Sequence, residues 1–435
     1  MLARYPGVLV TGVVLMLFSV RGASAVYPAT TRSGAIASRR REIRTCICVL
    51  SALLALFVQG CASIPERTPL SEENYAESRV LGMSGLRHWG DEVLLLVDDL
   101  PDEPTLAEMQ AALPGFVGRE VRVLAISGGG ADGAFAAGLL NGWSASGERP
   151  EFTVVTGIST GALIAPFAYL GPDYDHVIEG FYTQYSTKDL LEERGWIRLL
   201  LGGEAAFDTS RLRARIAGYI DESMMEAIAA EHRRGRYLLI GTTNLDAARP
   251  VIWDIGAIAE SDKPGALDLI HDIILASASI PIAFPPVLIE VESGGKVYDE
   301  MHTDGGVSRQ SFLFSLQAPE DSFRNLNIIG QGRAYLIRNS KLEIPWQPVD
   351  RKMVDIAGRS ANSLVHTQGL GDLYREFIGA QKFDFDFNLA YIPSTFKAES
   401  REMFDRDYMR KLYTLAYELA VDGYPWAKIP PGLGP

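Results

Sequence analysis

Cysteine is scarce in this chain of 435 residues, and its three copies all lie within the first sixty-one positions. Cys46 and Cys48 fall inside an apolar stretch near the N-terminus, and Cys61 follows that stretch. A chain that loses the stretch keeps one cysteine, which excludes an internal disulfide framework and a cysteine-based structural zinc site. No set of His, Cys, Asp and Glu residues has the spacing of a metal site, so we expect neither a metal nor another cofactor.

Positive charge is also scarce beyond the N-terminal region. The formal net charge is −13, although the first sixty residues hold seven arginines and a single acid. The remainder is therefore strongly acidic, which argues against a nucleic-acid partner and against adsorption to anionic lipid by charge alone. Attachment to a membrane would need an interaction other than charge.

Long apolar runs are confined to the N-terminal region, so no later segment is expected to cross a membrane. A basic stretch, 39–44, precedes the apolar segment 45–58 and then Gly60-Cys61-Ala62. This order resembles a bacterial lipoprotein signal. The resemblance implies cleavage before Cys61, a lipid anchor on Cys61 and a place in the cell envelope, where Ala62 favours the outer membrane. An inert buried thiol at Cys61 is the alternative.

A second apolar stretch, 7–20, ends in another small-residue cleavage pattern at Ala23-Ser24-Ala25. Two export signals in tandem conflict with each other. We therefore expect translation to begin downstream, so that residues 1–38 are absent from the native protein.

The rest of the chain divides by texture into three parts. Residues 61–118 are polar and contain prolines, and we expect a tether that becomes a partly packed arm near 86–90. From Val121 onward, short apolar runs alternate with helix-like segments, which predicts a three-layer α/β/α sandwich with a mostly parallel central sheet. We expect a catalytic core at 119–345, with a lid or wall at 174–236, and a helical region at 346–435. Strands are expected at 121–127, 152–156, 237–243, 296–298 and 334–338, and long helices at 353–380 and 401–421.

Two glycine-rich turns about thirty residues apart carry the strongest functional signal. In the turn Gly157-Ile158-Ser159-Thr160-Gly161, an apolar strand precedes the serine, and a G-x-S-x-G turn lifts a serine hydroxyl out of a strand end. The turn Gly128-Gly129-Gly130 follows another strand and precedes a helix expected from Ala131, so its backbone N–H groups face an anion. Together the turns supply a nucleophile and a place for an oxyanion, as acyl transfer requires.

Ser159 needs a base, and the chain offers only six histidines. No histidine occupies an evident late turn of the kind that α/β-hydrolases use. Thr303-Asp304-Gly305-Gly306 does stand at a strand end, from which an aspartate could reach the serine of another strand. His302 would share a strand face with Asp304, and we expect it to pack rather than to react. A Ser-His-Asp triad with His366 or another histidine remains an alternative.

In this order, the motifs resemble those of the patatin-like phospholipases. Four local matches carry the resemblance, which covers roughly Val121 to Ser308: Gly128–Gly133, Gly157–Gly161, the Ala/Ser-rich segment with its Phe-Pro turn at Ala276–Pro286, and Asp304–Gly306.

The resemblance implies a lipid acyl hydrolase that uses a Ser-Asp dyad through an acyl-enzyme intermediate, and the signal before Cys61 would anchor it at a membrane. Ser159 would attack the ester carbonyl, Asp304 would accept and return the proton, and Gly128–Gly130 would bind the oxyanion. The family usually carries Arg or Lys where this chain has Asp132, an acid that suits a helix N-terminus. The alternatives are a Ser-His-Asp carboxylesterase and a non-catalytic lipid-binding lipoprotein.

Overall fold

The computed structural model describes residues 67–93, 105–194, 205–320, 323, 326–344 and 346–433. These residues belong to one compact unit, Glu66–Pro435. The predicted signal region and Cys61 lie outside the described residues, so the lipid anchor and the domain boundaries stay predictions. Within the described ranges, none of the helices combines the length and the apolar character that crossing a bilayer requires.

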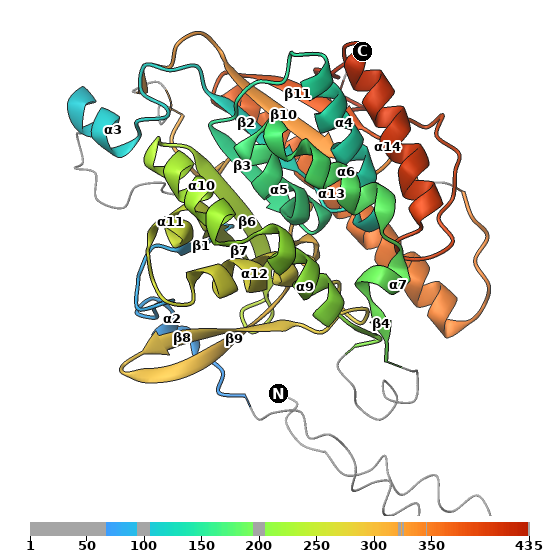
Figure 1. The fold of residues 1–435 in the computed structure, drawn as a ribbon, viewed down its shortest axis with the longest axis horizontal. Coiled ribbons are helices and arrows are strands. Elements are labelled where there is room, and N and C mark those ends of the chain that lie inside the picture. The colour runs from blue at the N-terminus through green and yellow to red at the C-terminus, as the bar shows by residue number, and fades with distance from the viewer. Residues whose placement is uncertain are drawn as a thin grey trace, which may run out of the picture. The chain divides into compact units, whose positions relative to one another are not determined.

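A nine-stranded sheet with a parallel centre organises the described part of the chain (Figure 1). Its strands are β1 (Arg87–Trp89), β2 (Arg122–Ile126), β3 (Val154–Ile158), β6 (Tyr237–Asn244), β7 (Arg249–Asp254), β8 (Val287–Ser293), β9 (Lys296–Asp304), β10 (Gly332–Arg338) and β11 (Phe385–Tyr391). The neighbours β6, β3, β2, β10 and β11 run parallel to one another. Antiparallel β7 and β1 extend the edge at β6, and β9 joins the end of β6 to β8. A separate small pair is β4 (Glu192–Glu193) with β5 (Phe207–Asp208).

Helices cover both faces of the sheet, which confirms the predicted α/β class. One apolar cluster joins the sheet to α4 (Ala134–Ala145), α5 (Thr160–Leu170), α6 (Asp175–Gln184), α9 (Ser210–Tyr219), α10 (Glu222–Arg233), α11 (Ile255–Glu260), α12 (Ala266–Ser277) and α14 (Arg406–Val421). A second cluster joins the opposite face to α3 (Leu106–Ala112) and α13 (Met353–Lys382). The short helices α2 (Glu72–Tyr75) and α7 (Thr187–Leu190) complete the set in the described ranges.

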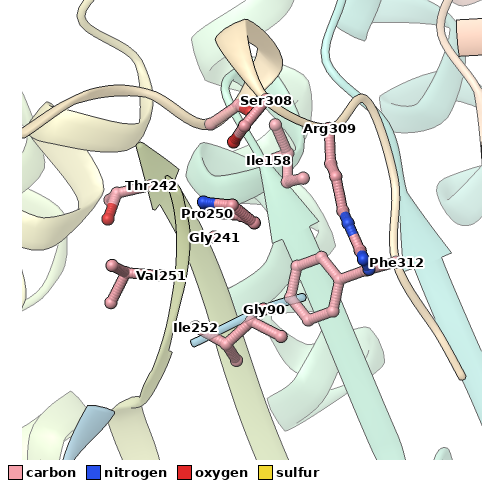
Figure 2. A pocket seen from close by; sticks show the side chains of 11 residues that line it. Gly90, Ile158, Gly241, Thr242, Pro250, Val251, Ile252, Ser308, Arg309 and Phe312 are labelled. Carbon is pink, nitrogen blue, oxygen red and sulfur yellow. The ribbon is translucent and has the colours of Figure 1, made fainter. Parts of the chain in front are cut away.

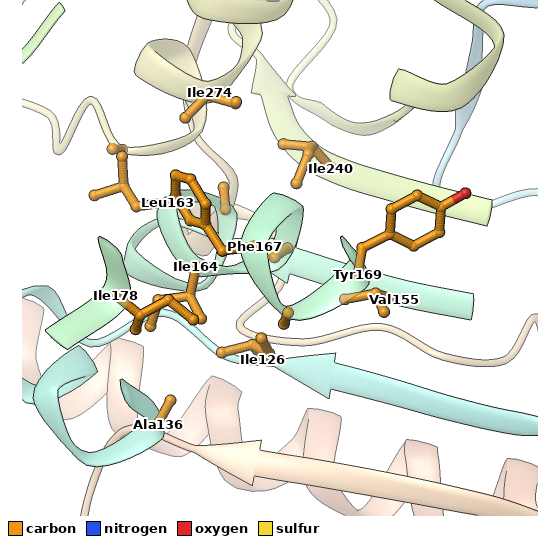
Figure 3. Close-up of a cluster of buried hydrophobic side chains, with 14 of the residues drawn as sticks. Ile126, Ala136, Val155, Leu163, Ile164, Phe167, Tyr169, Ile178, Ile240 and Ile274 are labelled. Carbon is orange, nitrogen blue, oxygen red and sulfur yellow. The ribbon is translucent and has the colours of Figure 1, made fainter. Parts of the chain in front are cut away.

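The central strands are mainly apolar, as expected for strands that are covered on both faces. Every residue of β3 and β6 is buried. Figure 3 shows Leu163, Ile164 and Phe167 of α5 in one cluster with Ile126 of β2 and Ile240 of β6. This packing holds α5 rigidly on the sheet, so the turn that precedes α5 has a fixed position.

The observed elements differ from the prediction in three places. Strands β4, β5, β7, β8 and β11 were not predicted, and β11 places a sheet strand inside the region 346–435 that we expected to be helical. The helix expected from Ala131 instead begins as a 3-10 turn, Gly130–Gly133, and α4 starts at Ala134. The arm near 86–90 is fully integrated, because β1 pairs with β7 at the sheet edge.

Candidate active site

Ser159 occupies a strained turn between β3 and α5. Its backbone has φ 56° and ψ −122°, which is uncommon for a residue with a side chain and typical of a nucleophile elbow. Its N–H donates to Ser277 Oγ at 3.0 Å, and the Ser277 hydroxyl donates to the Gly241 carbonyl at 2.6 Å. A Cβ at Gly161 would lie 2.1 Å from the Ile126 carbonyl oxygen, so only glycine fits there. Ser277 is thus a structural polar group that supports the elbow.

The sheet topology brings Asp304 to Ser159. Asp304 ends β9, which pairs with β6, and β6 lies next to β3. Ser159 Oγ donates to Asp304 Oδ2 at 2.6 Å, and the Gly306 N–H donates to Oδ1 at 2.7 Å. The two residues are only 6% and 5% exposed. Burial raises the pKa of Asp304 to about 6, against the lowering effect of these two hydrogen bonds, so the carboxylate is a better base than an ordinary aspartate.

The glycine loop offers two free donors rather than three. The Gly128 N–H donates to the backbone carbonyl of Gln310 at 3.2 Å, so it is engaged in the fold, contrary to expectation. Within the described part of the chain, the N–H groups of Gly129 and Gly130 donate to no acceptor. They belong to the start of the 3-10 turn, where the first N–H groups have no partner inside the helix. These two groups can bind an oxyanion.

Asn339 braces the glycine loop, and the sequence analysis missed it. Its N–H donates to Ser127 Oγ at 2.9 Å and its Nδ2 to the Ser127 carbonyl at 2.9 Å, while its Oδ1 accepts from the Ala136 N–H at 3.1 Å. A Cβ at Gly129 would lie 2.4 Å from the Asn339 carbonyl oxygen. A polar residue directly after the apolar strand β10 was the available signal, because parallel strands bring their carboxyl ends to one edge.

Gln310 is a second missed residue, and it connects the loop with the dyad turn. Besides accepting from Gly128, it donates from Nε2 to the Gly306 carbonyl at 2.9 Å. Its backbone N–H donates to Asp372 Oδ2 on α13 at 2.7 Å. Gln310 therefore holds the two glycine turns at a fixed separation.

The Asp132 side chain contacts α14. Its carboxylate accepts a hydrogen bond from the Tyr408 hydroxyl. Burial raises the pKa of Asp132 to about 6, while Tyr408 and the nearby cation of Lys341 lower it. At neutral pH this position therefore carries negative charge close to the glycine loop, where the family usually has a cation.

Neutralising Asp132 should help catalysis above pH 6. Asp132→Asn keeps an acceptor for Tyr408 and removes a charge that opposes the developing oxyanion. We expect kcat/KM for a neutral ester to rise about two- to tenfold near pH 8 and to change little near pH 5, where Asp132 is already protonated. Asp407→Asn, at an exposed acid on α14, is the matched control. A tenfold loss in a folded Asp132→Asn protein would contradict this account.

No histidine serves Ser159 in this structure. All six lie in the described ranges, and none of them hydrogen-bonds to the serine. His302 Nδ1 pairs with Thr242 Oγ1 at 2.9 Å and Nε2 with Glu300 Oε2 at 3.2 Å, and its ring lies edge-on to Trp253. His302 thus packs, as expected.

An apolar pocket lies beside the dyad strands. Figure 2 shows Arg309 and Phe312 on one side of this pocket and Val251 and Ile252 on the other. Ile158 and Gly305, the neighbours of the two dyad residues, also line it. In the described part of the chain, no group of three or more His, Cys, Asp or Glu side chains is placed to hold a metal ion.

The fold and this site define a class of protein: an α/β protein with a serine at a nucleophile elbow, a hydrogen-bonded acid and a loop with free N–H groups. Residues 124–315 match the family model of the patatin-like phospholipases. The segment agrees with the predicted range. This match supports lipid acyl hydrolase activity.

Two further comparisons were made with individual proteins. No curated protein matches the chain. Among solved structures, the crystal structure of VipD from Legionella pneumophila is similar with a TM-score of 0.34 and 12% identity, over 70% of this chain and 67% of that chain.

Proposed function

We propose that the protein hydrolyses acyl esters of phospholipids or lysophospholipids with a Ser159–Asp304 dyad, through an acyl-enzyme on Ser159. The observation that carries the proposal is the 2.6 Å hydrogen bond from Ser159 Oγ to Asp304 Oδ2. A hydroxyl becomes an effective nucleophile when a positioned base takes its proton in the transition state. Ser159 has this base and no other hydrogen-bond partner for its hydroxyl among the described residues.

The reaction follows from these contacts. Ser159 Oγ attacks the carbonyl carbon while its proton passes to Asp304 Oδ2. The carbonyl oxygen becomes an oxyanion, which accepts hydrogen bonds from the N–H groups of Gly129 and Gly130. When the carbonyl re-forms, the alcohol leaves with the proton from Asp304, and Ser159 holds the acyl group. Water then attacks the acyl-enzyme, Asp304 takes a proton from that water, and the same proton returns to Ser159 as the fatty acid departs.

The proposal includes attachment to the outer membrane through a lipid on Cys61. It is supported by the signal-like sequence before Cys61. The acidic body would gain little from anionic lipid headgroups, so an acyl anchor would keep the site near its substrate. One acyl chain alone binds a membrane weakly, and more than one chain would be needed for stable attachment.

The pH dependence of hydrolysis tests the role of Asp304. The base must be ionised, so kcat/KM should fall as the pH drops through the pKa of Asp304, near 6. We expect about tenfold lower kcat/KM for p-nitrophenyl butyrate near pH 5 than on the plateau near pH 8 in the Asp132→Asn protein. The fall should be smaller in wild type, because Asp132 is protonated over the same pH range and then no longer opposes the oxyanion. The Asp132→Asn protein should keep this acid limb and raise only the plateau. If the fall in kcat/KM at acid pH vanished in Asp132→Asn, the carboxyl that titrates would be Asp132 and not Asp304. That result would contradict the proposal.

A further inference from the structure

Arg338 is a buried cation without a hydrogen-bond partner. It is the last residue of β10 and is only 5% exposed. Its Nε is sealed from solvent without an acceptor, and neither Nη atom donates to any described residue. Burial lowers the pKa of Arg338 only to about 10, so the side chain is charged at neutral pH. A buried guanidinium with unused donors is costly unless a partner completes it.

The carboxylate whose charge acts on Arg338 is already engaged by other groups. Asp372 raises the pKa of Arg338 through its charge but makes no hydrogen bond to it. Instead, Asp372 accepts from the Gln310 N–H and pairs with Arg375. The guanidinium donors of Arg338 thus remain available to an anion from outside.

The side chain of Gln310 lies between Arg338 and the nucleophile Ser159, as two close approaches show. A Cβ at Gly369 of α13 would lie 2.9 Å from Arg338 Nη1 and 3.2 Å from Gln310 Cγ. A Cβ at Gly128 would lie 3.0 Å from Gln310 Oε1 and 3.3 Å from Ser159 Cβ. Arg338 therefore lies close enough to Ser159 to contact another group of the same substrate, but it does not reach the reacting atoms.

Exposed apolar side chains lie on the part of α13 that precedes Gly369. The helix is exposed over its first turns and becomes buried at Gly369. Met353, Ile356, Leu364 and Val365 are exposed along this portion. Val365 lies one turn before Gly369 on the same helix face. Exposed apolar side chains on the helix that packs against a buried cation fit an amphiphile with an anionic group.

We propose that Arg338 binds the phosphate of the phospholipid whose acyl ester lies at Ser159. This proposal rests on the proposed function and adds a residue that determines specificity. The planar guanidinium pairs two oxygens of a phosphate at once, and the phosphate satisfies donors that the fold leaves unused. The glycine loop itself brings no cation, because Asp132 stands there. A neutral glyceride with the same acyl chains has no group for Arg338.

Substrate comparison tests the proposal in the full-length chain. In mixed micelles with a neutral detergent, Arg338→Gln should lower kcat/KM for a phosphatidylcholine roughly 10- to 100-fold. The same change should alter kcat/KM for diacylglycerol and p-nitrophenyl butyrate less than about threefold, since neither carries phosphate. Arg338→Lys should fall between wild type and Arg338→Gln, because it keeps the charge and loses the fork. Arg333→Gln, at an exposed arginine of the same strand, is the matched control and should leave kcat/KM unchanged for every substrate.

Gly369→Ala keeps the proposal testable if Arg338→Gln does not fold. The new Cβ would displace the guanidinium, whose Nη1 lies 2.9 Å away, and would touch Gln310 Cγ at 3.2 Å, so we expect a several-fold loss on phosphatidylcholine and a smaller loss on p-nitrophenyl butyrate. Equal losses on all substrates, or none on phosphatidylcholine, would overturn the proposal. The proposal would also be overturned if inorganic phosphate inhibited p-nitrophenyl butyrate hydrolysis through Arg338 while the enzyme showed no preference for the phospholipid. Ser159→Ala separates the two hypotheses: if it retains activity on all substrates, the proposed function fails whatever Arg338 does.

Discussion

Replacing Ser159 by alanine should reduce fatty-acid release at least about a thousandfold, and Asp304→Asn should do the same. Alanine removes the nucleophile, while asparagine keeps the shape of the acid and removes the base that accepts the proton from Ser159 Oγ. The double variant should be no worse than either single one, because the two residues act as a unit. The measurement is the initial rate of fatty-acid release from a phospholipid and of nitrophenol from p-nitrophenyl butyrate.

Matched variants make this result specific. Ser308→Ala removes a nearby hydroxyl that pairs with Thr243, and Asp299→Asn alters an acid on the same strand as Asp304. Both should keep activity within about threefold of wild type, as should His302→Gln, which tests the triad alternative. Wild-type turnover in Asp304→Asn, or a thousandfold loss in His302→Gln with the fold intact, would show that the base has been misassigned.

Gly129→Ala should cost about 100- to 1000-fold in kcat, the value of one oxyanion donor. A methyl group at position 129 would lie 2.4 Å from the Asn339 carbonyl oxygen and 2.7 Å from the Asn339 Cβ. The loop must therefore move, and its N–H groups no longer point at the oxyanion. The measurement is kcat with p-nitrophenyl butyrate, at saturating substrate.

Gly130→Ala is the matched control for this effect. A methyl group there meets no atom within 4 Å, and the backbone has φ +57°, which alanine adopts at a modest cost. The N–H stays in place, so we expect a decrease of less than about tenfold in kcat, together with a small loss of stability. If Gly130→Ala were as damaging as Gly129→Ala, close packing against Asn339 would not be the cause.

The parallel centre of the fold was predictable because β2, β3, β6 and β10 are mainly apolar runs that both layers bury. The other strands lacked that signal. In β8 buried residues alternate with exposed or half-buried ones, and β7 contains Pro250, which breaks an apolar run. In β11, polar Asp386 and Asn388 alternate with apolar residues, directly after the thirty-residue helix α13. Such strands depend on pairing partners that are distant in sequence.

The candidate site shows the same division. Ser159 and Asp304 stand in glycine-rich turns, whose local geometry is visible in a motif. The state of the Gly128 N–H depends on Gln310, and the brace on the loop depends on Asn339, far along the chain. No motif marks these contacts, since they arise only when the strand ends meet. Arg338 likewise stands out only in the structure, because its guanidinium has no hydrogen-bond acceptor among the described residues.

The most direct measurement is covalent labelling of the full-length protein with a fluorophosphonate, followed by peptide mass spectrometry. A fluorophosphonate reacts with a serine only when a base and an oxyanion site activate it. This account predicts a single phosphonyl adduct on Ser159 that is absent from Ser159→Ala and strongly reduced in Asp304→Asn. Well-folded protein without a label on Ser159, or with the label on another serine, would contradict it.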